Sequence, residues 1–176
     1  MPLEKAHQDW LKNDDLFIEQ LLIGRDGELK IGRELQKRGV TVQVTPLEIR
    51  KDVNDRDEFK NQADMYAWKG DRKYRIEVKS LNYAFTGIGD FPFNNAIIVS
   101  ANKWRNIVDA GNKPAAWVLV SRKSTGIVVV PGSSEPMWFK ESIFDGVRKI
   151  RFDAMKVNKK HLRSFESLVQ YLGGTT

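Results

Sequence analysis

The pattern with the clearest chemical potential in this chain is an acidic residue followed two positions later by a lysine. It occurs four times, as Glu28-Leu-Lys30, Glu58-Phe-Lys60, Asp71-Arg-Lys73 and Glu77-Val-Lys79. Only Glu77 and Lys79 lie inside an alternating strand-like segment, where every second side chain points to the same face. Two opposite charges on one face of a strand expected to be central are unusual, because charged side chains are rarely buried without a partner.

Asp64 begins the preceding strand-like segment, and Gly70-Asp71 predicts a tight hairpin turn between the two strands. This hairpin would bring Asp64 beside the end that carries Glu77 and Lys79. Two carboxylates and the backbone carbonyl of Val78 would form an oxygen-rich site suited to Mg²⁺ or Mn²⁺. Lys79 could then orient an attacking water, which predicts phosphodiester hydrolysis. A structural salt bridge at a strand end is the alternative interpretation.

The composition narrows the possible chemistry. Cysteine is absent and the two histidines are His7 and His161, which excludes thiol catalysis and sites built from several histidines. The formal net charge of +6 favours anionic partners such as nucleic acid. No apolar run approaches the ~18 residues of a membrane-spanning helix, and residues 1–7 lack a signal-peptide pattern. We therefore expect a cytoplasmic protein without a membrane partner.

Hydrophobic periodicity predicts a mixed α/β fold. Gly24 and Gly27 are expected to separate a first helix from a second. We read residues 47–61 as a charged loop and residues 81–95 as a long ordered loop rich in aromatics. The expected helices cover residues 8–22, 26–38, 102–110 and 158–172, and the expected strands cover residues 40–45, 63–68, 73–80, 97–99, 115–121 and 127–131.

Glu28 is a further acidic candidate, at the start of the second predicted helix. Ile31, Gly32 and Leu35 follow it by three, four and seven positions, so Glu28 shares the helix face expected to pack on the sheet. Glu34 lies on another face and can pair with neighbouring basic residues, which is typical of a surface salt bridge.

The motif residues resemble the PD-(D/E)xK motif of nucleases, most closely that of Holliday-junction resolvases and related phage endonucleases. The resemblance rests on Gln62-Ala63-Asp64 and Ile76-Glu77-Val78-Lys79-Ser80, with 13 positions between the two acids. Glu28, eleven positions before Gly39, matches a glutamate of the first core helix in those proteins. Ala63 stands where the motif has proline, a residue that binds no metal. The match covers residues 24–80, and in element order extends to about residue 121.

The resemblance implies a restriction-endonuclease-like core, with a mixed central sheet and the order helix–strand–strand–strand–helix–strand. It implies that Asp64, Glu77 and the Val78 carbonyl bind Mg²⁺ or Mn²⁺, with Glu28 a further ligand that could act through water. Lys79 would be the catalytic lysine and Ser80 an auxiliary residue. The implied protein is a metal-dependent DNA endonuclease that acts on branched or single-stranded DNA in recombination or repair. A homodimer and a phage-encoded origin are also compatible with the resemblance.

We expect one nuclease domain over residues 1–176, with a core at about 24–121, an N-terminal helix in 1–23 and a C-terminal extension at 122–176 that adds strands and a helix. Residues 140–163 hold eight basic and three acidic residues, a candidate phosphate-binding surface or an ordinary solvated face. Two rival functions are an RNA-directed nuclease and a non-catalytic nucleic-acid-binding module. The candidate nucleic-acid contacts are Arg50, Lys51, Lys60, Lys103, Lys113, Lys159 and Lys160.

Overall fold

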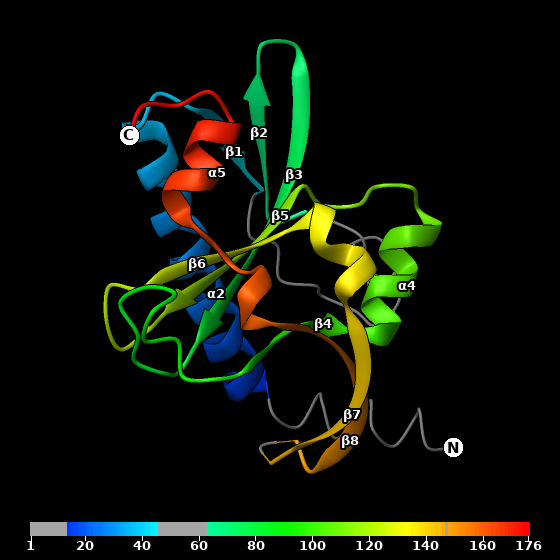
Figure 1. Ribbon diagram of the computed structural model, residues 1–176. Helices are drawn as coiled ribbons and strands as arrows, with labels where there is room; N and C mark the ends of the chain where they lie inside the picture. The colour runs from blue at the N-terminus through cyan, green and yellow to red at the C-terminus, as the bar shows by residue number, and fades with distance from the viewer. Residues whose placement is uncertain (1–13, 46–62, 147) are drawn as a thin grey trace.

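The computed structural model describes residues 14–45, 63–146 and 148–176, which form two β-sheets with helices packed against them (Figure 1). The predicted charged loop at 47–61 lies outside the described residues. The helices are α2 (Asp14–Lys37), α4 (Ala101–Asp109) and α5 (Phe165–Tyr171), with short 3-10 helices η2 (Gly132–Met137) and η3 (Lys159–His161). The strands are β1 (Thr41–Val44), β2 (Met65–Lys69), β3 (Arg72–Leu81), β4 (Asn95–Ser100), β5 (Ala116–Ser121), β6 (Ile127–Pro131), β7 (Phe139–Asp145), β8 (Ile150–Asn158) and β9 (Arg163–Ser164).

The central sheet has the strand order β1-β2-β3-β5-β6-β9, so β3 is an interior strand as predicted. β3 and β5 run parallel, whereas the other neighbouring pairs are antiparallel. The mixed α/β fold class is thereby confirmed, and the order helix–strand–strand–strand–helix–strand recurs as α2, β1, β2, β3, α4 and β5. β4 is inserted before α4 and joins β8 and β7 in a separate antiparallel sheet.

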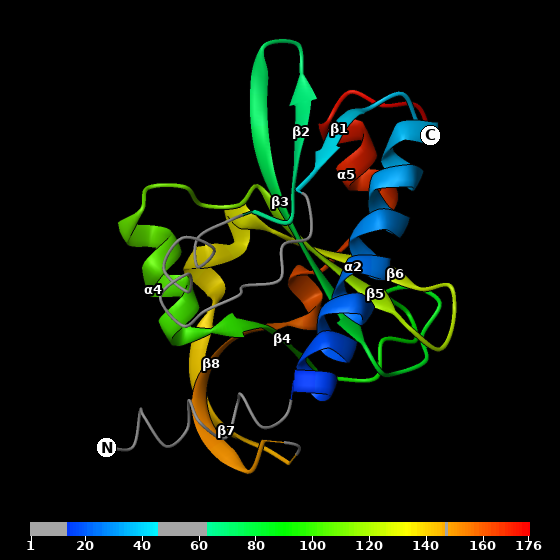
Figure 2. The same ribbon diagram turned by 180° about the vertical axis from the view of Figure 1, so that it is seen from behind.

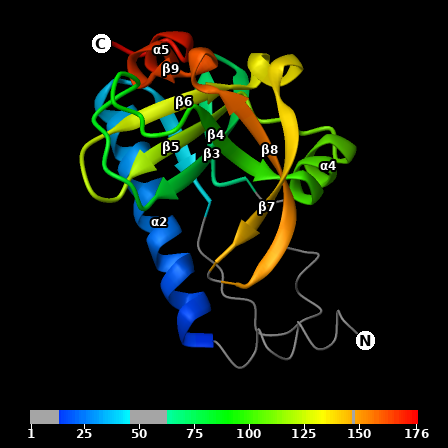
Figure 3. The ribbon, with the colours of Figure 1, turned by 60° about the horizontal axis from the view of Figure 1, so that its bottom comes forward.

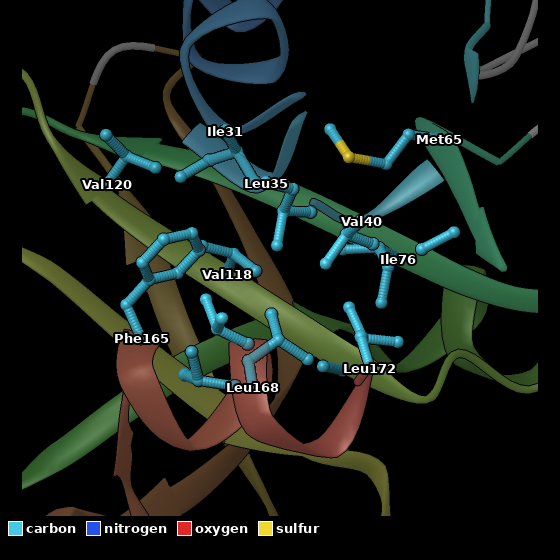
Figure 4. Close-up of a cluster of buried hydrophobic side chains, with 14 residues drawn as sticks. Ile31, Leu35, Val40, Met65, Ile76, Val118, Val120, Phe165, Leu168 and Leu172 are labelled. Atoms are coloured by element: carbon cyan, nitrogen blue, oxygen red, sulfur yellow. The ribbon is translucent and has the colours of Figure 1, made fainter. Parts of the chain in front are cut away.

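Two hydrophobic cores lie on opposite faces of the central sheet, because alternate residues of each strand point to opposite sides. Figure 4 shows the first core, in which side chains of α2 and α5 meet Val118 and Val120 of β5. The second core lies between Trp117 and Leu119 on the other face of β5 and the layer formed by α4 and the second sheet. Because β5 is covered on both faces, all six of its residues are buried.

Residues 122–176 contribute to both cores and to the central sheet. β6 and β9 are strands of that sheet, and Leu168 of α5 is buried in the first core. Val157 of β8 is buried in the second core, where the second sheet supports α4 (Figure 3).

The predicted helix over 158–172 is wrong at its N-terminal end. β8 continues to Asn158 because it pairs with β4, and the Asn158 side chain then accepts a hydrogen bond from the Lys160 N–H to begin η3. The helix itself begins at Phe165, after Ser164, whose side chain accepts from the Ser167 N–H as an N-cap.

The predicted break between the first two helices is also wrong, because α2 is a single helix through Gly24 and Gly27. A helical glycine costs about 1 kcal/mol relative to alanine, yet packing of Ile31 and Leu35 in the first core holds the helix on the sheet. Gly27 lies against the Ser80 side chain and Gly32 against Val44, so the absence of side chains lets α2 approach the strands closely. Within the described residues, no helix is long and apolar enough to span a membrane.

The predicted hairpin at Gly70-Asp71 is confirmed. Gly70 has a φ of +61°, a conformation that glycine adopts without strain, and the β2–β3 hairpin projects beyond the rest of the sheet (Figures 1 and 2). Met65 lies opposite Ile76, so the preceding residue, Asp64, faces Glu77.

Two glycines of α2 should respond oppositely to alanine. A Cβ on Gly24 would meet nothing within 4 Å, whereas one on Gly32 would lie 2.8 Å from Val44 Cγ2. We expect Gly24→Ala to raise the melting temperature by about 2–4 °C through helix propensity. Gly32→Ala should lower it, because overpacking costs about 1–3 kcal/mol. Thermal unfolding followed by circular dichroism measures both, and equal stabilisation by the two variants would contradict the close approach at Gly32.

Candidate active site

The register of β2 and β3 brings Asp64 and Glu77 together. The Asp64 N–H donates to Glu77 Oε2 at 2.9 Å, and the Val78 N–H donates to Asp64 Oδ2 at 2.8 Å. Each carboxylate is therefore held by the backbone of the opposite strand. The structure thus places the two predicted acids side by side at the start of β2, where β3 enters the centre of the sheet.

Arg75 forms a buried ion pair with Glu77. Its Nη2 lies 2.5 Å from Glu77 Oε1, and the two side chains are 1% and 0% exposed. Arg75 Nη1 also donates to the carbonyl oxygen of Asn112 at 3.3 Å. The sequence interpretation missed this residue, although its position two before Glu77 puts both side chains on one strand face. Arg75 compensates the charge of a carboxylate that water cannot reach.

Glu28 reaches the same region from α2. Arg25, one helical turn earlier, pairs with Glu28 Oε2 at 3.4 Å and donates to the carbonyl oxygen of Thr45 at the end of β1. Burial raises the pKa of Glu28, and Arg25 partly offsets the rise through its hydrogen bond and charge; a side-chain hydrogen bond with Asp64 also lowers the pKa. Glu28 therefore adjoins Asp64, and Arg25 ties it to the central sheet.

Asp64 has the most perturbed carboxyl group of the site. Its pKa is raised well above the usual value, first by burial and then by the negative charge and side-chain hydrogen bond of Glu77. The charge of Lys103 and the Val78 N–H act in the opposite direction. Ionisation of Asp64 beside Glu77 is therefore costly where solvent screens charge poorly, and a bound cation would lower that cost.

Lys79 is a half-buried lysine on the same strand face as Glu77. Burial, together with the positive charges of Lys103 and Arg148, lowers the pKa of Lys79 to about 8. Arg148 comes from the turn between β7 and β8, so the second sheet approaches the site from one side and α4 from another. No sequence pattern predicts that the charge of Arg148 acts on Lys79, because the path of the β7–β8 hairpin decides where the Arg148 side chain lies.

The donor atoms suit a hard divalent cation, since they are carboxylate oxygens without histidine or cysteine. Asp64 and Glu77 are adjacent, with Glu28 next to Asp64. In the described ranges, however, no three acidic or histidine side chains are already grouped closely enough to hold a metal ion. The fit to Mg²⁺ or Mn²⁺ thus rests on the chemistry and charge of the donor atoms, and metal binding stays a prediction.

Ser80 lies apart from Lys79 because neighbouring residues of a strand point to opposite faces. Its side chain lies against Gly27 of α2. Val78 contributes its N–H to Asp64, so its peptide group adjoins the site, and metal binding by its carbonyl stays a prediction.

Of the predicted nucleic-acid contacts that the structure describes, Lys103 lies near the candidate site and the others lie elsewhere or are paired. Lys103, in the first turn of α4, is close enough for its charge to act on both Asp64 and Lys79. Lys113 instead pairs with Glu135 at 2.9 Å, and Lys159 and Lys160 are exposed on η3. Arg50, Lys51 and Lys60 lie outside the described residues.

The basic segment 140–163 follows β7, β8 and η3. Part of its charge is neutralised locally, because Lys156 pairs with Glu141 and Arg148 with Asp145. In the aromatic loop after β3, Phe85 and Phe91 are buried in the second core, whereas Tyr83 and Phe93 are exposed.

Comparison with known proteins finds a similar solved structure. It is that of Archaeoglobus fulgidus Hjc, described as a Holliday junction resolvase from an archaeal hyperthermophile, with 14% identity and a TM-score of 0.48. The match covers 84% of this chain and 95% of that chain. Neither a protein-family model nor a curated protein matches the chain.

We expect neutralisation of Asp64 and neutralisation of Glu77 to change the stability of the protein in opposite directions. Asp64→Asn removes a buried negative charge and keeps an acceptor for the Val78 N–H, so we expect a higher melting temperature at pH 7 in EDTA. Because the folded pKa of Asp64 is raised, its ionisation costs stability as pH rises above 3.8, and the advantage of Asp64→Asn should shrink as pH falls towards that value.

Glu77→Gln should instead destabilise the protein by about 3 kcal/mol, because Arg75 would lose its buried counter-charge. Glu34→Gln, a change to a more exposed carboxylate paired with Lys37, serves as the control and should alter stability by less than about 0.5 kcal/mol. A Glu77→Gln variant as stable as this control would show that Arg75 does not need Glu77 as its buried counter-charge.

Proposed function

We propose that this chain is a metal-dependent nuclease that hydrolyses phosphodiester bonds in DNA. The observation that carries the proposal is that Asp64 and Glu77 are held side by side, with Lys79 on the same strand face as Glu77 and its pKa lowered to about 8. A structural salt bridge would pair Glu77 with Lys79, but the Glu77 carboxylate is instead paired with Arg75.

Asp64 and Glu77 would hold the divalent ion, and Glu28 would complete the site directly or through a water. A bound divalent ion supplies Lewis acidity to phosphoryl and water oxygens. Arg75 keeps the Glu77 carboxylate in one orientation, and Arg25 does the same for Glu28. These two arginines restrict the acidic side chains before substrate arrives, which reduces the reorganisation needed for catalysis.

Lys79 would act on the scissile phosphate and the attacking water. A lysine whose pKa is about 8 is largely protonated at neutral pH and can stabilise negative charge on the phosphoryl oxygens. The same pKa lets it exchange a proton with a nearby water more readily than an ordinary lysine. Lys103 and Arg148 surround it with positive charge, which favours binding of an anionic substrate.

DNA is the proposed substrate, with a preference for branched structures. Support comes from the motif resemblance of Asp64, Glu77 and Lys79 to structure-selective nucleases and from the net charge of +6. An RNA-directed nuclease would use the same site. A non-catalytic binding module would retain the basic surface and keep the acids for structural reasons.

Cleavage assays test the proposal directly. With Mg²⁺ or Mn²⁺, the wild-type chain should cut at least one of a four-way junction, a single strand and a linear duplex, and EDTA should abolish the cutting. We expect Glu77→Ala and Lys79→Ala to lower the cleavage rate at least 100-fold while DNA binding in EDTA changes little. Matched RNA substrates identify an RNA-directed enzyme.

Two results would overturn this assignment. Cleavage by both variants at the parental rate would remove Glu77 and Lys79 from the chemistry. A parent that binds DNA but cuts no substrate with either metal would support the non-catalytic binding module. Tyr171→Leu, an exposed substitution on α5, controls for general effects of mutation.

Lys103 should contribute to DNA binding more than Lys113 does. Lys103 acts electrostatically on the site, whereas Lys113 is engaged with Glu135. Measured in EDTA at several salt concentrations, Lys103→Met should reduce the slope of log affinity against log salt by about 0.9, the value for one phosphate contact. Lys113→Met is the matched control, and equal slopes for the two variants would remove Lys103 from the DNA contacts.

A further inference from the structure

Among the described residues, the hydrophobic cores cover one face of the projecting β2–β3 hairpin. Met65 and Ala67 of β2 are fully buried in the first core. Tyr66 and Trp68 alternate with them and point to the other side. In the part of the chain that the structure describes, neither hydrophobic core includes a side chain from that side of β1 or β2. Figures 1 and 2 show the hairpin extending beyond the body of the protein.

An aromatic and basic cluster occupies this second side, and we call Tyr66, Trp68 and Lys73 the aromatic face. The two rings are 6.4 Å apart between centroids. Lys73 Nζ lies 3.9 Å from the Tyr66 ring centroid and 5.9 Å from that of Trp68. The ammonium group is thus held beside two rings by cation–π attraction. Thr41 and Gln43 of β1 extend the same side and are exposed.

The aromatic face continues from the candidate active site along the same strands. Trp68 pairs with Lys73 and Tyr66 with Arg75, and Arg75 in turn binds Glu77. Trp68 follows Asp64 by four residues, a distance of roughly 13 Å along an extended strand. A stacked nucleic-acid strand advances about 3.4 Å per nucleotide, so Trp68 would lie about four nucleotides from the scissile phosphate.

The charge of the hairpin favours a polyanion. Lys69, Arg72 and Lys73 are exposed near its tip, and Asp71 is the one acidic residue within 65–75. Aromatic rings interspersed with cations are typical of surfaces that bind single-stranded nucleic acid, where rings stack on bases and cations contact phosphates. A protein-binding sheet face would be expected to present more aliphatic surface, which this side of the hairpin lacks.

We propose that the aromatic face is a stacking platform for unpaired bases on the strand that leads away from the scissile phosphate. Trp68 stacks on a base, and Lys73, held over the Tyr66 ring, contacts a neighbouring phosphate. The position relative to the cut rests on the proposed function, whereas binding of unpaired nucleotides does not. A duplex presents base edges rather than base faces to the protein, so the platform selects single strands and unpaired arms.

Equilibrium binding in EDTA tests the platform without cleavage. Fluorescence anisotropy would compare a labelled single-stranded oligonucleotide, a duplex with a single-stranded overhang and a blunt duplex. We expect Trp68→Leu to weaken binding of the first two about 10-fold and to change blunt-duplex binding less than 2-fold. Trp68→Phe, which keeps an aromatic ring, should retain most of the affinity.

Two further variants separate stacking from effects on folding. Lys73→Glu leaves both rings in place at an exposed position and should weaken single-strand binding, so it tests the face even if Trp68→Leu unfolds. Tyr171→Leu removes an exposed ring that packs edge-to-face against Tyr74, on the opposite side of the same hairpin. This control should bind all three oligonucleotides as the parent does.

Several outcomes would overturn the platform. One is that Trp68→Leu and Lys73→Glu both bind the single strand as tightly as the parent does. Another is that they weaken binding of the single strand and of the blunt duplex equally. A third is that light scattering shows the parent to be a dimer that either substitution dissociates. The last outcome would identify a self-association surface. Failure of the nuclease proposal can be distinguished from failure of the platform. If the parent cuts no substrate but Trp68→Leu still loses single-strand binding, the platform is supported and the nuclease proposal is not.

Discussion

A fully buried carboxylate, that of Glu77, constrains the centre of this protein. A buried charge is costly unless it is paired and hydrogen-bonded, and here Arg75 and the Asp64 N–H occupy its two oxygens. Both partners depend on the register of β2 against β3, since a slip by one residue would turn every side chain of a strand to the opposite face. The pairing that neutralises Glu77 also sets Asp64 beside it and leaves Lys79 without that carboxylate as a partner.

The site combines Glu77, whose charge is compensated, with Asp64 and Lys79, whose environments shift their pKa values. Burial and the charge of Glu77 raise the pKa of Asp64, while burial and the charges of Lys103 and Arg148 depress that of Lys79. Perturbed groups of both kinds in one place are characteristic of functional sites. The two cores around β5 provide the stability that lets the sheet hold such charges close together.

Much of the fold could be predicted because the signals are local. The alternation in β3, the glycine turn at residue 70 and the apolar runs of β5 and β6 each reflect a backbone preference or a burial pattern. The errors arose where tertiary packing overrides local preference. Gly24 and Gly27 do not end α2, because packing of Ile31 and Leu35 in the first core outweighs their low helix propensity. Residues 158–164 do not join α5, because they form the end of β8, η3 and β9.

The chemical repertoire can be read from the residues alone: carboxylates and lysines without cysteine, an excess of basic residues, and two acidic residues, Asp64 and Glu77, brought together by a tight hairpin turn. These follow from residue types and short-range spacing. Tertiary packing, in contrast, determines that Arg75 neutralises Glu77, that Lys103 and Arg148 approach Lys79, and that, among the described residues, neither hydrophobic core covers the aromatic face of the hairpin. Those relations depend on how α4 and the second sheet pack across the central sheet, and contacts between residues distant in the chain leave no local pattern to read.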